Sequence, residues 1–118
     1  MTAPVVICTS AFGADSVHQY GQRHFIARAA RAGADGIEIR EELFTAQDRP
    51  YETLGACVRD AGLFCIYSST LALFVEQGRS SRLNEALSDA LAIAEALDAR
   101  FLKVSLGQFP LDLSLIHI

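Results

Sequence analysis

The chain has 118 residues, of which 51% are hydrophobic and 20% are charged, and its formal net charge is -4. This composition is typical of one globular domain, here residues 1–118, and it excludes a strongly basic nucleic-acid-binding surface. No apolar run approaches the roughly 20 residues that a membrane span requires, so neither nucleic acid nor membrane is expected as a partner. Arg23, Arg28 and Arg31 gather along one early helix, where a solvated face is expected.

The N-terminal segment and the cysteines indicate a cytoplasmic protein. Residues 1–12 are apolar but lack the basic start and the long apolar core of a secretory signal. The three cysteines, Cys8, Cys57 and Cys65, are an odd number with no C-x-x-C pairing. Such a set favours reduced, buried thiols over a disulfide framework or a zinc site.

The first strand and the first helix are predicted within the first third of the chain. The apolar run at residues 5–8 is typical of a short buried strand. After Gly13, either Asp15 or Ser16 is expected to cap a helix that continues through residues 25–30 and ends at Gly33. Residues 9–14 contain one glycine and no G-x-G-x-x-G motif, which disfavours a nucleotide-binding loop.

A second strand is predicted at residues 36–39, and a second helix after Asp48, with Pro50 in its first turn. The apolar stripe of this helix consists of Tyr51, Leu54, Gly55, Val58 and Ala61. Gly62 is expected to end it.

A third strand is predicted at residues 63–67, ending at Ser68 and Ser69. Ser80 or Ser81 is expected to cap the third helix. Its apolar stripe consists of Leu83, Leu87, Ala90, Leu91, Ala94 and Leu97. A fourth strand follows at residues 101–104.

The predicted order of elements is therefore β-α-β-α-β-α-β, which indicates an α/β fold with parallel strands. The spacing between strands is long enough for helical crossovers. Periodicity leaves two architectures open, part of a barrel or a small doubly wound sheet.

Residues 32–40 read Ala-Gly-Ala-Asp-Gly-Ile-Glu-Ile-Arg. This segment resembles the second strand of xylose isomerase-like barrels, where a helix ending in an Ala-Gly turn runs into a strand reading G-(I/V)-E-(I/L). The following Glu-Glu-Leu-Phe at 41–44 is similar to a bacterial subgroup of sugar phosphate isomerases and epimerases. Residues 63–69 and 102–107 lie where the third and fourth strands of that family are expected, so the resemblance covers residues 5 to 109.

The resemblance implies the N-terminal half of a (β/α)8 TIM barrel, since such barrels have roughly 250 residues. It implies an isomerase or epimerase for a small sugar or sugar phosphate, dependent on a divalent metal (Mn, Mg, Co or Zn). The metal ligands and catalytic acids of the family lie on later strands, so no catalytic or metal residue is assigned here, and this fragment is expected to be inactive. A sugar-acid dehydratase or lyase of the same superfamily and a non-enzymatic, flavodoxin-like α/β domain remain as alternatives.

Four residues are the candidates for substrate binding. Alternation along the second strand directs Ile37 and Ile39 to one side and Glu38 and Arg40 to the other, which is the interior of the expected barrel. Lys103 interrupts the fourth strand, and Ser68 follows the third. Contacts with a sugar hydroxyl, a phosphate or a carboxylate are one interpretation; a structural ion pair of Glu38 with Arg40 or Lys103 is the other.

Three further expectations concern the remainder of the chain. His18 and His24 are expected on the first helix, at the surface or packed against a neighbouring helix, and not in a metal site. Residues 111–118 do not continue the family pattern, and residues 114–118 resemble translated adapter sequence, so the segment is either a non-native tail or a genuine terminal strand or loop. A half-barrel leaves one edge of the first strand and one edge of the fourth strand unpaired, which predicts self-association into a homo-oligomer or poor solubility.

Overall fold

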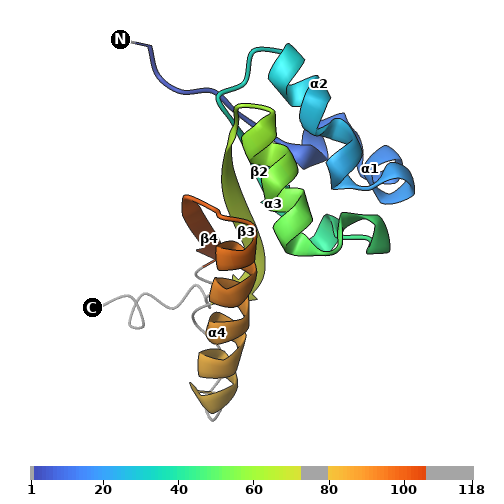
Figure 1. Ribbon diagram of the computed structural model, residues 1–118. Coiled ribbons are helices and arrows are strands. Elements are labelled where there is room, and N and C mark those ends of the chain that lie inside the picture. The colour runs from blue at the N-terminus through green and yellow to red at the C-terminus, as the bar shows by residue number, and fades with distance from the viewer. Residues whose placement is uncertain (1, 73–79, 106–118) are drawn as a thin grey trace, which may run out of the picture.

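The computed structural model describes residues 2–72 and 80–105, and its centre is one parallel sheet (Figure 1). The four strands are β1 (Val6–Cys8), β2 (Gly36–Arg40), β3 (Phe64–Ala72) and β4 (Phe101–Ser105). They pair in the order β1-β2-β3-β4, and every pair is parallel. All four predicted strands are therefore present, and the parallel α/β pattern is confirmed.

Helical segments connect the strands. The α-helices are α1 (Ala14–Tyr20), α2 (Ile26–Arg31), α3 (Tyr51–Asp60) and α4 (Ser80–Ala96). Four short 3-10 helices accompany them: η1 (Thr9–Phe12), η2 (Gln22–Phe25), η3 (Glu41–Leu43) and η4 (Ala46–Asp48). In the described part of the chain, no helix is both long and apolar enough to cross a bilayer.

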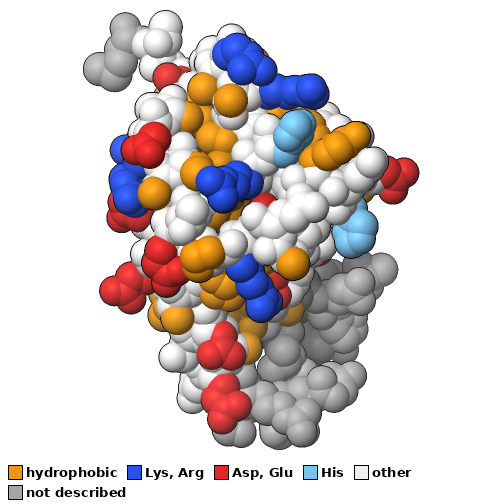
Figure 2. All heavy atoms as spheres, turned by 45° about the vertical axis from the view of Figure 1, so that its right-hand side comes forward, with side chains coloured by type: hydrophobic (Ala, Val, Ile, Leu, Met, Phe, Trp, Pro, Cys, Tyr) orange, Lys and Arg blue, Asp and Glu red, His pale blue; other side chains and the backbone are white. Residues whose placement is uncertain are grey.

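The arginines of the early helices lie at the surface, as predicted. Arg23, Arg28 and Arg31 are all exposed, and the guanidinium carbon of Arg28 lies 5.5 Å from the centroid of the Phe25 ring. Figure 2 shows that basic and acidic side chains are interspersed on this side of the molecule. These arginines therefore form a mixed, solvated surface.

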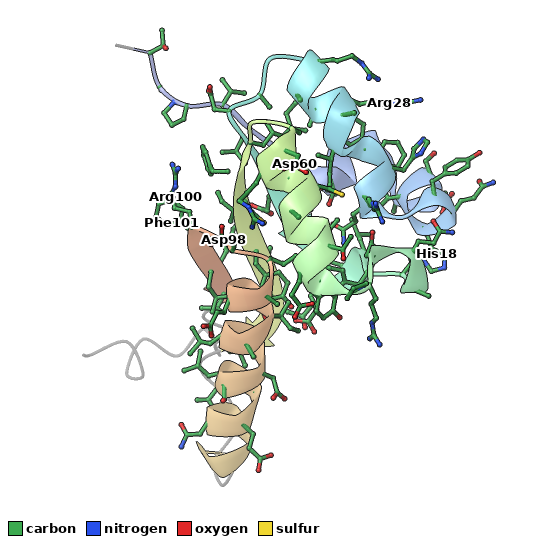
Figure 3. All side chains as sticks on the ribbon, viewed as in Figure 1. His18, Arg28, Asp60, Asp98, Arg100 and Phe101 are labelled. Carbon is green, nitrogen blue, oxygen red and sulfur yellow. The ribbon has the colours of Figure 1, made fainter. Side chains whose placement is uncertain are left out.

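The described histidines also lie at the surface. His18 is exposed on α1, and Figure 3 shows it far from Arg100 and Phe101, where β4 begins. His24 is exposed in η2, where its ring stacks on Tyr20 with 5.0 Å between the centroids. The predicted surface and packing roles are confirmed for both residues, whereas His117 lies outside the described residues.

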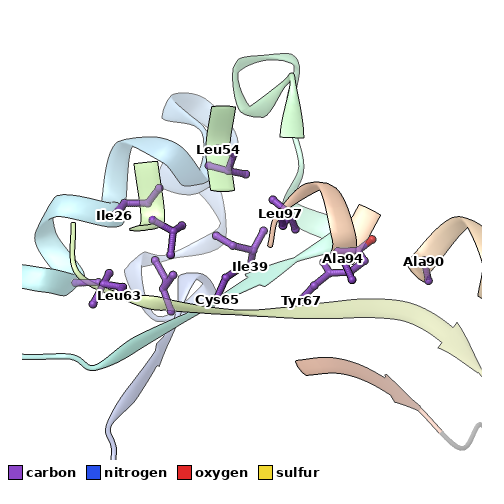
Figure 4. Close-up of a cluster of buried hydrophobic side chains, with 12 residues drawn as sticks. Ile26, Ile39, Leu54, Leu63, Cys65, Tyr67, Ala90, Ala94 and Leu97 are labelled. Carbon is purple, nitrogen blue, oxygen red and sulfur yellow. The ribbon is translucent and has the colours of Figure 1, made fainter. Parts of the chain in front are cut away.

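The main hydrophobic core lies between one face of the sheet and the helices α2, α3 and α4 (Figure 4). Ile37 and Ile39 of β2 are both 0% exposed and belong to this core. Strand β3 contributes Cys65 and Tyr67 from alternate positions, and Leu97 comes from the turn directly after α4. The predicted alternation is therefore confirmed, because the apolar side chains of β2 face the helices and its polar ones face away.

The predicted first helix is in fact two helices, which is a correction. Gly21 has φ 82° and ψ 156°, an extended positive-φ conformation that glycine adopts without steric cost, and it ends α1 before η2 and α2 begin. Gly13 stands at the N-cap of α1, and no side chain caps this helix, so the predicted caps Asp15 and Ser16 are wrong. Gly33 does take the left-handed conformation predicted after the helix, with φ 91°.

Helix α3 confirms the predicted stripe, since Leu54, Gly55 and Val58 are buried, and Gly62 follows it with φ 79°. Its start differs slightly from the prediction. Pro50 is the N-cap residue of α3 and not part of its first turn, and Asp48 belongs to η4. The 1% exposed Asp48 accepts a hydrogen bond from the Thr45 amide at 3.0 Å, so it closes the preceding turn.

Half of the predicted third-helix stripe is buried, namely Ala90 and Ala94 of α4 and Leu97 directly after it. Leu91 is a correction, because it is 53% exposed, and Ile93 packs against the core instead. The predicted caps Ser80 and Ser81 and the predicted tail at 111–118 lie outside the residues whose side chains are described.

Candidate functional site

The four predicted substrate-binding residues lie together on the sheet face opposite the main core. Residue pairing aligns Arg40 of β2 with Ser68 of β3, and Ser68 with Lys103 of β4. Glu38 lies two residues before Arg40 and therefore on the same side of β2. Arg40 is the last residue of β2, whereas Ser68 and Lys103 lie in the middle of β3 and β4, so this polar row crosses the sheet at the carboxyl end of β2.

Glu38 connects two of these strands through ion pairs. Its Oε2 lies 3.0 Å from Nη1 of Arg40, and its Oε1 lies 3.3 Å from Nζ of Lys103. Glu38 is only 8% exposed, so these contacts compensate a carboxylate that is otherwise removed from water. The structural ion pair considered for Glu38 is present with both partners.

Arg40 has further partners at the edge of this group. Its Nε donates to Oε1 of Glu42, and its Nη1 lies 3.6 Å from Sγ of Cys8. The hydrogen bond to Glu42, followed by that to Cys8, raises the pKa of Arg40 above its ordinary value. Arg40 is therefore a permanent cation, and these hydrogen bonds orient its guanidinium group.

A pocket of about 200 Å³ opens beside this row. Liquid water occupies about 30 Å³ per molecule, so the space suits several waters or one small ligand group. Its lining comes from β2, β3 and β4 and consists of Arg40, Ser68, Ser69, Lys103, Val104 and Ser105. Three of the four predicted residues line it directly, whereas Glu38 lies beneath and orients the two cations.

Strand β3 is longer than predicted, and this changes the role of Ser69. The strand continues to Ala72, so Ser68 and Ser69 lie inside it and do not end it. Ser68 belongs to the polar row, whereas Ser69 donates a hydrogen bond through Oγ to Oε1 of Glu41 at 2.9 Å. The strand is extended because its distal part still pairs with β4, where Ala72 is aligned with Ser105 across a register shift.

The sequence interpretation missed Glu41, which joins η3 to the end of β3. Its Oε1 accepts hydrogen bonds from the amide of Thr70 at 3.0 Å, from Oγ of Ser69 at 2.9 Å and from the hydroxyl of Tyr67 at 3.4 Å. Burial alone would raise the pKa of Glu41, but these hydrogen bonds outweigh it and lower that pKa. The carboxylate fixes the loop after β2 against β3.

Gln22 was also missed. It is 0% exposed and lies between η1 and the end of β2. Its Oε1 accepts from Oγ1 of Thr9 at 2.7 Å, and its amide group pairs with the main chain of Arg40. The only sequence signal was a polar residue inside an otherwise helical pattern, which by itself does not identify a buried contact.

The described residues do not assemble a metal site of their own. Within residues 2–72 and 80–105, no group of three His, Cys, Asp or Glu side chains is arranged to hold a metal ion. Glu38 directs one oxygen to Arg40 and the other to Lys103.

Comparison with protein-family models and with curated proteins found no match to this sequence.

Proposed function

We propose that the chain forms the first half of a (β/α)8 barrel within a longer cytoplasmic polypeptide, and that it contributes part of the substrate pocket of a sugar or sugar phosphate isomerase or epimerase. The remaining strands would supply the divalent metal site and the catalytic acids. On this proposal the 118-residue chain binds substrate groups but does not catalyse the reaction.

The topology supports a barrel over a doubly wound sheet. The strands follow one another in chain order, β1-β2-β3-β4, and the helices α2, α3 and α4 pack on the same face. A doubly wound sheet reverses its strand order at a switch point and carries helices on both faces. The flavodoxin-like alternative is therefore less well supported among the described residues.

The observation that carries the proposal is the polar row that crosses the sheet at the carboxyl end of β2. Glu38, Arg40, Ser68 and Lys103 lie on the face that a barrel would enclose. In characterised TIM-barrel enzymes the active site lies at this end of the strands. A row of ionic and hydroxyl groups there supplies hydrogen bonds to an oxygen-rich substrate.

The chemistry of this half is binding and orientation. Arg40 and Lys103 donate hydrogen bonds and carry positive charge, and Ser68 offers a hydroxyl group. Isomerisation next to a carbonyl needs a base within hydrogen-bond reach of the substrate proton. Because Glu38 is held by two cations, we assign it to orienting them, and the base is expected on the other half of the barrel.

The test begins with the complete reading frame at this locus, expressed as one polypeptide. We expect it to interconvert at least one member of a panel of aldoses, ketoses and their phosphates with added Mn²⁺. Incorporation of solvent deuterium beside the carbonyl, followed by NMR, reports the proton transfer directly.

Two variants serve as a matched pair in this assay. Lys103→Met is expected to lower kcat/KM at least tenfold, whereas Arg31→Met, which removes the same charge from an exposed helix, is expected to leave it unchanged. A reading frame without further strands, or an enzyme that exchanges no proton with any panel member, contradicts the proposal. Loss of water from a sugar acid would instead identify the dehydratase alternative.

A further inference from the structure

The charged side chains that line the pocket are both cations. Among the described residues, those that line it include two cations, Arg40 and Lys103, together with three serines, and none of these lining residues is acidic. Their carboxylate partners do not line it: the side chain of Glu38 is only 11% exposed, and Glu42, which is 41% exposed, pairs with Nε of Arg40. A ligand in the pocket therefore contacts the two cations directly.

Both cations retain donors for a ligand. The described hydrogen bonds of Arg40 use Nε and Nη1, while a guanidinium group carries five N–H donors. Lys103 directs one contact to Glu38, while an ammonium group has three donors, and its side chain is 60% exposed. Glu38 holds the two cations at one place, where they would otherwise repel each other.

These two lining cations belong to a chain whose formal net charge is -4. Long-range attraction by the whole molecule therefore does not favour anions, and the preference must come from local geometry. Arginine and lysine with neighbouring hydroxyl groups are the donors that bind phosphate and carboxylate oxygens in proteins.

We infer that the Arg40–Lys103 pocket binds the anionic group of its ligand, a phosphate or a carboxylate, and does not recognise a neutral polyol. This inference deepens the proposed function and rests on it for the identification of the ligand as a sugar. Anion binding, however, is measured on the 118-residue chain without any assay of catalysis. Failure of anion binding is therefore distinguishable from failure of the proposed isomerase or epimerase activity.

The sequence provides a selective probe, because Lys103 is its only lysine. Reductive methylation with ¹³C-formaldehyde labels this side chain and the N-terminal amine while preserving their positive charge. The N-terminal signal is the internal control. The labelled chain is titrated separately with inorganic phosphate, acetate and glycerol at constant ionic strength, and the ¹³C signals are followed by NMR.

We expect saturable shifts of the Lys103 signal with phosphate or acetate and none with glycerol. A tighter response to phosphate identifies a phosphate-bearing ligand, and a tighter response to acetate identifies a carboxylate-bearing one. Equal responses to glycerol and the anions, or shifts that match those of the N-terminal amine, overturn the inference.

Variants test the same point without the label. Lys103→Met is expected to weaken anion binding, measured by calorimetry, at least tenfold, and Arg31→Met is expected to change it less than twofold. Equal losses in both would show that only general charge attraction is involved and would overturn the inference. Because Lys103 is largely exposed, its replacement is expected to leave the fold intact, which circular dichroism checks.

Discussion

The side-chain amide of Gln22 pairs with the main chain of Arg40 as a neighbouring strand would. Its Nε2 donates to the Arg40 carbonyl at 2.8 Å, and its Oε1 accepts from the Arg40 amide at 2.9 Å. The same Oε1 accepts from the hydroxyl of Thr9, so one buried side chain joins the ends of β1 and β2. The position of the Arg40 cation therefore depends on a residue in η2.

Replacing Gln22 with leucine should destabilise the chain considerably. The substitution leaves the amide and carbonyl of Arg40 and the hydroxyl of Thr9 without their partner, and each unsatisfied buried group costs about 1–3 kcal/mol. We expect the free energy of unfolding, from urea denaturation, to fall by about 3 kcal/mol. Gln19→Leu, at an exposed position of α1, is the control, and equal effects of the two changes would contradict this account.

Gly55→Ala tests the close approach of α3 to the end of α4. A Cβ atom at Gly55 would lie 2.5 Å from the carbonyl oxygen of Leu97, which is main chain and cannot rotate away. Alanine favours a helix by about 1 kcal/mol over glycine, yet we expect a net loss of about 1–3 kcal/mol from overpacking. Thr53→Ala, on the exposed side of α3, should change stability by less than about 0.5 kcal/mol. A stabilised Gly55→Ala chain would refute the packing argument.

Glu41 should make the chain sensitive to acid. Its folded-state pKa lies below the ordinary value of 4.5 because hydrogen bonds from Thr70, Ser69 and Tyr67 outweigh the effect of burial. The stabilisation is therefore present above the unfolded-state pKa and is lost as the pH falls through the folded-state pKa. We expect Glu41→Gln to flatten the fall of stability below pH 4.5, measured by urea denaturation across pH. Glu95→Gln, at an exposed site on α4, is the control. Below pH 4.5, the stability of Glu95→Gln should fall more steeply than that of Glu41→Gln.

The cysteines should differ in reactivity. Burial, followed by the nearby charge of Asp98, raises the pKa of Cys65 to about 12, and the residue is 3% exposed. Cys8 and Cys57 are half-buried. Because the thiolate is the reactive form, Cys65 should react with iodoacetamide only after unfolding. Peptide mapping by mass spectrometry checks this, and equal labelling of all three cysteines in the native chain would contradict it.

The edges of the sheet should cause self-association. Strands β1 and β4 stand at the two edges of the described sheet, and Phe101 on β4 is 58% exposed. Unpaired edge strands with apolar side chains are templates for pairing with another chain. We expect sedimentation velocity to show concentration-dependent oligomers, and Phe101→Lys to reduce them more than Leu91→Lys, an exposed change on α4. A sharp monomer at all concentrations would contradict the expectation.

Local sequence determined which segments form strands and helices. Alternation at 36–40 places Ile37 and Ile39 toward the helices, because successive side chains of a strand point to opposite faces. Glycines at 33 and 62 mark helix ends, because each takes a left-handed conformation that other residues avoid. These features involve neighbouring residues only, which is why they were predictable.

Tertiary structure alone decided how the polar groups meet. Lys103 contacts Glu38 across 65 positions of sequence, and Glu41 receives hydrogen bonds from residues 26 to 29 positions away. The turn at Gly21 brings Gln22 inward to Arg40, although the helical pattern continues through it. Pairing and register fix such contacts, and neither leaves a periodic signal in the residues concerned. The sequence by itself therefore determined the parallel α/β order and the polar face of β2, whereas packing of the whole sheet determined the partners of that face.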